Sequence, residues 1–148
     1  MKRFVWRLQR VLDIRKKEEQ KVRVELLELT ERLAQTRGEL LTQQQMLEDI
    51  INGLIGENPE KRLGKQEFFL RYSTATDEQI KKLEGKVSEL ESQQRDKIAE
   101  VLKLRKLKEG MEKLRTEAKM RFIAEQEKLE QKQLDERATV SYVRKSHS

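Results

Sequence analysis

A heptad pattern of aliphatic residues, unbroken over some fifty positions, limits what this chain can fold into. With Leu26 at position a of the repeat abcdefg, seven of the eight a positions from Val5 to Leu54 are aliphatic. The a positions are Val5, Leu12, Glu19, Leu26, Leu33, Leu40, Leu47 and Leu54, and the d positions are Leu8, Arg15, Val22, Leu29, Thr36, Gln43 and Ile50. This repeat predicts a long helix with one narrow apolar stripe, which needs a second helix to cover it.

A cluster of helix-disfavouring residues ends this pattern, and a second helical pattern follows it. Gly53, Gly56, Pro59 and Gly64 fall within twelve residues. We predict a first helix over residues 1–54, a turn over 55–64, a second helix over 65–140 and a flexible tail over 141–148. Two stripes joined by one turn predict an all-α fold, a long two-helix antiparallel coiled-coil hairpin. The second helix is the longer one, so its C-terminal part should overhang the first.

The apolar residues of the second pattern fall into two heptad frames that differ by three residues. Ile80, Leu83, Val87 and Leu90 share the first frame. The second frame holds Leu104, Leu107, Met111, Leu114 and Ala118. We therefore predict a discontinuity in the coil between residues 94 and 101.

Composition excludes most kinds of chemistry. The chain has no cysteine, and its one histidine, His147, lies in the predicted tail. A catalytic triad, a cysteine site and a multi-histidine metal site are therefore excluded. The glycines do not form a phosphate-binding loop. We predict no catalytic, cofactor-binding or metal-binding residue, and a protein that is not an enzyme. No apolar run has the length of a membrane span, and no secretory signal opens the chain, so a cytoplasmic location is expected.

Charge is distributed unevenly along the chain. Residues 1–17 carry seven basic side chains and one acid, and residues 101–122 carry eight basic side chains and three acids. By contrast, residues 24–54 carry two basic and six acidic side chains. An antiparallel hairpin brings the two basic segments together. The sequence thus predicts a basic open end, which attracts an acidic partner at long range.

Aromatic residues gather after the turn. Phe68, Tyr72 and Ala75 have the i, i+4, i+7 spacing of one helical stripe, and Gln79 continues it, whereas Phe69 points elsewhere. Two interpretations stay open. Either the turn folds over these side chains, or they anchor a partner protein.

The two ends of the chain resemble the FliJ family, a small coiled-coil component of the flagellar type III export apparatus. Residues 4–15, FVWRLQRVLDIR, are similar to the start of that family, with an aromatic residue, Arg-Leu-Gln and Leu-Asp-x-Arg. Residues 127–138, EKLEQKQLDERA, resemble its Leu-Asp-Glu-x-Ala close. Chain length, the single turn and the basic balance agree with the resemblance.

The resemblance implies a non-enzymatic stalk, similar to the gamma subunit of rotary ATPases. Its open end would enter the hexameric export ATPase, through Arg3, Arg7, Arg10 and Lys113. A second surface would contact the membrane export gate, through Phe68, Tyr72, Ala75 and Gln79. Export chaperones are further implied partners. No cofactor, nucleic acid or membrane insertion is expected. The implied location is cytoplasmic, at the inner membrane beside the export apparatus.

Three other interpretations remain. The chain could be the equivalent stalk of an injectisome, which has the same fold. A basic coiled coil could also bind nucleic acid, with affinity that falls steeply as salt rises. Against this interpretation, the basic residues alternate with glutamate. Finally, the overhang could pair with a second copy in a structural dimer.

Overall fold

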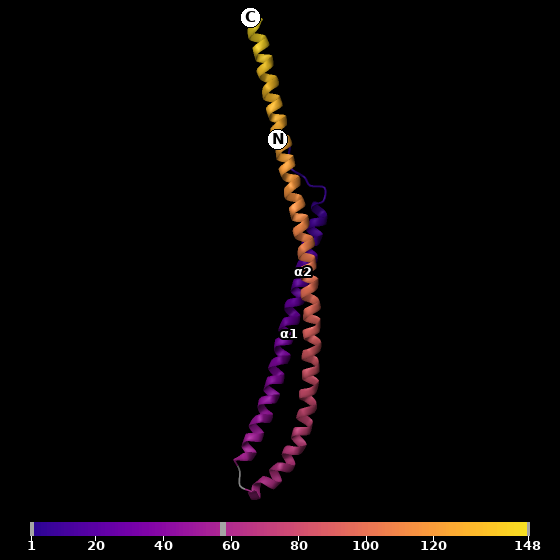
Figure 1. The fold of residues 1–148 in the computed structure, drawn as a ribbon, viewed down its shortest axis with the longest axis vertical. Coiled ribbons are helices and arrows are strands. Elements are labelled where there is room, and N and C mark those ends of the chain that lie inside the picture. The colour runs from indigo at the N-terminus through magenta and orange to yellow at the C-terminus, as the bar shows by residue number, and fades with distance from the viewer. Residues whose placement is uncertain (1, 57–58, 148) are drawn as a thin grey trace. The chain divides into compact units, whose positions relative to one another are not determined.

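A computed structural model of the protein, which describes residues 2–56 and 59–147, contains two helices and no strand in these residues. Helix α1 spans Gln9–Ile55 and helix α2 spans Pro59–Ser146 (Figure 1). Glu25 of α1 contacts Lys97 of α2, whereas Arg37, further along α1, contacts Glu91, which is earlier in α2. The two helices are therefore packed antiparallel, and the predicted all-α hairpin is confirmed.

The chain divides into two compact units, and each unit contains a segment of both helices. One unit comprises residues 1–20 and 102–148, and the other comprises residues 21–101. We call residues 21–101 the body. Within the first unit, we call the paired segments 2–20 and 102–122 the base.

A compact apolar core holds the body together. Leu29, Leu33 and Leu90 form a buried cluster, and Val87 packs against it. Leu33 is 1% exposed. Full burial of one such side chain is worth roughly 1.5–3 kcal/mol. These residues occupy positions a and d of their heptads, so the repeat itself places the core between the helices.

The heptad frame predicted for α1 is confirmed. From Leu8 to Leu54, every a and d residue is buried or half-buried. Val5 is the exception, at 81% exposed, and it precedes the first residue of the helix. The predicted frame therefore holds along the whole of α1, and it fails only before the helix begins.

The discontinuity predicted in α2 is wrong. One frame of buried and half-buried residues runs without interruption from Ile80 to Phe122. It leaves Leu107 42% exposed and Leu114 50% exposed, and it places Lys108 and Arg115 in the seam instead. The physical reason is that α1 supplies partners for both cations, which a pattern of leucines cannot reveal.

Helix α2 begins earlier and ends later in the chain than the sequence indicated. The helix begins at Pro59, six residues before the predicted start at residue 65, and ends at Ser146. Proline is favoured at the first helical position, because its missing N–H would have no partner there and its fixed φ suits the helix. Ser73 and Thr74 also stay helical, with their hydroxyls donating to the Leu70 carbonyl. Residues 57 and 58 of the predicted turn, and residues 1 and 148, lie outside the described residues.

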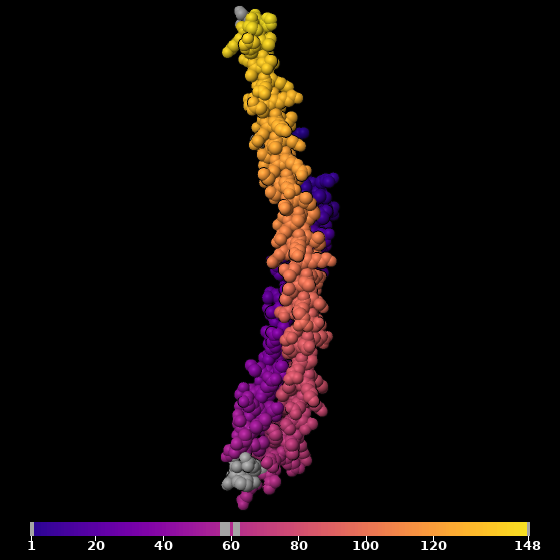
Figure 2. Space-filling model, viewed as in Figure 1, coloured from indigo at the N-terminus to yellow at the C-terminus, as the bar shows by residue number. Residues whose placement is uncertain are grey.

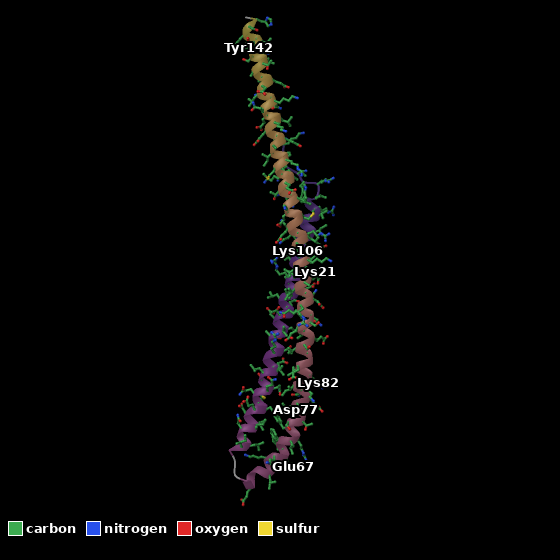
Figure 3. The ribbon with its side chains drawn as sticks, viewed as in Figure 1. Lys21, Glu67, Asp77, Lys82, Lys106 and Tyr142 are labelled. Carbon is green, nitrogen blue, oxygen red and sulfur yellow. The ribbon has the colours of Figure 1, made fainter. Side chains whose placement is uncertain are left out.

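The last part of α2 has no neighbouring helix in its unit. Every described side chain from residue 127 to residue 147 is exposed. Figure 2 shows this end of α2 in yellow, with no other segment beside it. Tyr142, labelled in Figure 3, is 75% exposed. None of the described helices has the length and apolar composition that crossing a bilayer requires.

Candidate protein-binding surfaces

The base concentrates the positive charge of the protein. Residues 1–20 and 102–122 together hold 15 basic and 6 acidic side chains, a net charge of +9. The body holds 13 basic and 16 acidic side chains, a net charge of −3. The net charge of the whole chain, +6, is therefore smaller than that of the base alone. A field of this kind increases the rate of encounter with acidic surfaces.

A buried carboxylate lies in the seam of the base. Glu19 is 4% exposed at an a position. Its Oε2 lies 3.2 Å from Lys108 Nζ, and its Oε1 lies 3.9 Å from Arg105 Nε. The attraction of these two cations offsets the free-energy cost of removing the Glu19 carboxylate from water. They also fix the register, because a shifted pairing would leave Glu19 buried without a cation.

The non-helical N-terminal segment is held against α2 through Phe4. Its ring lies 5.5 Å from the Phe122 ring, centroid to centroid. The Arg115 guanidinium carbon lies 5.5 Å from the centroid of the same ring, within cation–π range. Arg115 Nε also donates a hydrogen bond of 2.8 Å to Gln9 Oε1. These contacts keep residues 2–8 on the base although they precede α1.

The four residues that the resemblance implies for ATPase binding all belong to the base. Arg3, Arg7, Arg10 and Lys113 are exposed. None of them makes a hydrogen bond or ion pair within the described part of the chain. Their charges are thus available to a partner. Arg3 and Arg7 precede α1, so helical spacing does not apply to them.

The four residues implied for gate binding lie on one stripe of α2, in the body. Phe68 is 67% exposed, and its ring stacks on Tyr72 with centroids 6.2 Å apart. Ala75 and Gln79 are exposed, and Tyr72 is half-buried. In the observed heptad frame, the four residues alternate between positions c and g. Figure 3 labels Glu67 beside this stripe and, further along α2, Asp77 and Lys82.

A second apolar surface near the turn was missed in the sequence. Ile51, Leu54 and Ile55 of α1 line a cavity of about 350 Å³ with Gln66, Phe69 and Leu70 of α2. Phe69 is half-buried here, whereas Phe68 remains on the outer stripe. The only signal in the sequence was that Ile51 and Ile55 fall outside positions a and d. The aromatic residues after the turn therefore serve two different surfaces.

The described residues contain no group of three or more His, Cys, Asp or Glu that could hold a metal ion. The side chains of both surfaces offer charge and apolar area, which suit protein binding.

Comparison with known proteins gives one family. The family model described as flagellar FliJ protein matches residues 3–147, which include the whole of both helices. No curated protein and no solved structure gives a significant match.

Proposed function

Because the chain belongs to the FliJ family of flagellar export proteins, we propose that it is a non-enzymatic stalk that couples the export ATPase to the export gate. In this proposal the base binds the hexameric ATPase, and the stripe of Phe68, Tyr72, Ala75 and Gln79 contacts the gate. Export chaperones are further partners. The protein acts in the cytoplasm, peripherally at the inner membrane, and its loss impairs motility.

The observation that carries the proposal is that the two units present unlike surfaces. The base has a net charge of +9, whereas the body has a net charge of −3 and presents an exposed aromatic stripe. A protein with one binding activity needs only one of these surfaces. Two surfaces of different chemistry suit two partners, one recognised by charge and the other by apolar contact. The flagellar description of the matching family favours this system over an injectisome.

Charge reversal tests the base. Changing Arg3, Arg7 and Arg10 to Glu lowers the charge of the base by six units and should abolish co-sedimentation with the export ATPase. Helicity should stay unchanged, because all three side chains are exposed. The matched control changes Lys81, Lys82 and Lys86 of the body to Glu, which alters the total charge equally.

Equal ATPase binding by both triple variants would remove the base from the proposal. Retention of duplex DNA by the wild type, lost in the base variant and steeply reduced by salt, would favour a nucleic-acid function instead.

Truncation tests the aromatic stripe. Phe68→Ala with Tyr72→Ala should lower binding to the purified cytoplasmic part of the export gate and reduce swimming, with ATPase binding unchanged. The control is Leu27→Ala with Leu41→Ala, because these body residues are 60% and 66% exposed and lie outside the stripe. Unchanged gate binding in the first variant would show that the stripe has a structural role only.

A further inference from the structure

One side of the base is apolar, although the seam does not need it. In the observed frame, Val11 occupies position g of α1, and Leu107 and Leu114 occupy position g of α2. Ile14 occupies the neighbouring c position of α1. These four side chains are 41%, 42%, 50% and 49% exposed, respectively. We call them the base stripe.

The four residues lie on the same side of the pair of helices. Gln9 contacts Arg115 and Glu19 contacts Lys108, so Val11 lies at about the level of Leu114. In an antiparallel pair, position g of one helix faces position g of the other. The body shows this pairing directly, because Lys97 Nζ contacts both Glu25 and Glu100, two g residues, at 2.6 Å and 3.4 Å.

The pattern of the base stripe is that of a helical bundle. A two-stranded coil needs apolar residues at positions a and d only, whereas helices that pack against two neighbours are apolar at a, d and g. In the body, most of the g positions are polar, with Met46 and Tyr72 as the large apolar exceptions. The polar ones include Glu25, Arg32, Glu39, Lys86, Gln93 and Glu100. The base therefore has the pattern of helices that accept a third helix.

Charge defines which helix can occupy the stripe. Positions c and f beside it hold exposed cations from both helices, which are Arg10, Lys17, Lys103, Lys106 and Lys113. Lys106 is labelled on α2 in Figure 3. A second copy of the base would bring another charge of +9 against this surface, and repulsion opposes that pairing. A partner helix with apolar residues at i, i+3, i+4 and i+7 and acidic residues on its flanks fits both features.

We infer that the base stripe docks an acidic amphipathic helix of the export ATPase, which forms a local three-helix bundle with α1 and α2. This inference rests on the proposed function and deepens it. The basic residues increase the encounter rate and set the orientation of the docked helix, while Val11, Ile14, Leu107 and Leu114 supply the buried contact area.

Gly110 provides a direct test, because it occupies position c between Leu107 and Leu114. A Cβ added there meets no atom within 4 Å, so a larger residue fits without disturbing the hairpin. Gly110→Glu places an acidic side chain in the docking surface and should weaken binding to the purified ATPase about tenfold or more, since burial and charge both oppose it. Glutamate is more favourable than glycine in a helix interior, so folding is retained.

The matched control is Gly85→Glu in the body, where an added Cβ also meets nothing within 4 Å. It should bind the ATPase like the wild type. Leu107→Gln with Leu114→Gln, which removes apolar area and adds no charge, should also weaken binding.

The outcomes separate the two proposals. Wild-type protein that fails to bind the ATPase contradicts the proposed function. Binding that survives in Gly110→Glu and in the double glutamine variant contradicts the base stripe alone. A photoreactive side chain at position 110 should crosslink to a helical ATPase segment of net negative charge, and a crosslink to a basic or non-helical segment overturns the inference. Loss of binding to vesicles containing anionic lipid, with ATPase binding intact, would also overturn it, in favour of a membrane surface.

Discussion

The seams of the base and the body follow the same heptad frame, yet the base adds a buried ion pair to its apolar contacts. In the body, the helices bury Leu29, Leu33 and Leu90, and polar pairs such as Arg37–Glu91 lie outside the core. In the base, Leu12 is buried as well, but Glu19 takes the next a position and pairs with Lys108, and Arg115 lies in the seam against Gln9. The two seams thus differ in what they exclude from water.

This difference separates what stabilises the helix pair from what selects its register. Burial of leucine is favourable in any register that keeps leucine opposite leucine, so the body supplies binding energy between the helices. A buried ion pair contributes less net free energy, because desolvation offsets attraction, but it penalises every wrong register. The polar layer of the base therefore aligns the helices, while the buried leucines of both units supply the stabilising contact area.

The largest expected effect comes from the core of the body. Leu33→Ala removes a side chain that is 1% exposed and should lower the free energy of unfolding by about 2–5 kcal/mol. Leu27→Ala, at a residue that is 60% exposed, should change it by less than about 0.5 kcal/mol. Urea unfolding followed by circular dichroism measures both values. Similar losses in the two variants would contradict the assignment of the body as the stabilising seam.

An intermediate effect is expected from the polar layer of the base. Glu19→Ala leaves Lys108 without its buried partner and should cost about 1–3 kcal/mol, less than a fully buried pair because the Lys108 side chain is 20% exposed. Replacing both residues by leucine should restore or raise stability, because the layer then resembles the body. Thermal unfolding of the wild type, both single variants and the double variant completes the cycle. A double variant less stable than Glu19→Ala would show that the polar layer also supplies net stability.

The smallest effect concerns an ion pair at the edge of the body. Lys97 donates a 2.6 Å hydrogen bond to Glu25, which lowers the pKa of the Glu25 carboxyl below its ordinary value; the same bond raises the pKa of Lys97. The stabilisation from Glu25 is therefore present at neutral pH and is lost as pH falls through the lowered pKa. That from Lys97 is lost only as pH rises through its raised pKa. The side chains of Lys97 and Glu25 are 31% and 37% exposed and remain in contact with solvent, so screening keeps the effect small.

Unfolding midpoints of the wild type and Glu25→Gln should differ at pH 7 and converge in acid, below the ordinary range of a glutamate carboxyl. A difference that persists in acid would mean that Glu25 acts through packing and not through charge.

The sequence predicted the fold well where the pattern was apolar. The a and d positions of α1 from Leu8 to Leu54 are all buried or half-buried, because most of them are aliphatic and the rest follow by register. The family resemblance, seen in two terminal segments, is confirmed by a match over residues 3–147.

Prediction failed where charge replaced leucine. Leu107 and Leu114 suggested a new frame, whereas the seam runs through Lys108 and Arg115. The deciding contacts, with Glu19 and Gln9, join residues 89 and 106 positions apart and leave no local signal. The start of α2 was also mispredicted, because proline disfavours the helix interior but is favoured at the first helical position, which Pro59 occupies. The base stripe depends on the corrected frame, so it could not be predicted from the sequence.

The Glu19–Lys108 ion pair also constrains how the sequence can evolve. An exposed residue of this coil can be exchanged in one mutational step, and so can a leucine that is replaced by another aliphatic residue. Glu19 and Lys108 change less simply. Replacement of Glu19 alone leaves Lys108 unmatched in the seam, and replacement of Lys108 alone leaves the Glu19 carboxylate with only Arg105, 3.9 Å away. Related chains should therefore keep both residues or exchange both together. The body can diverge gradually, while the base changes in paired steps.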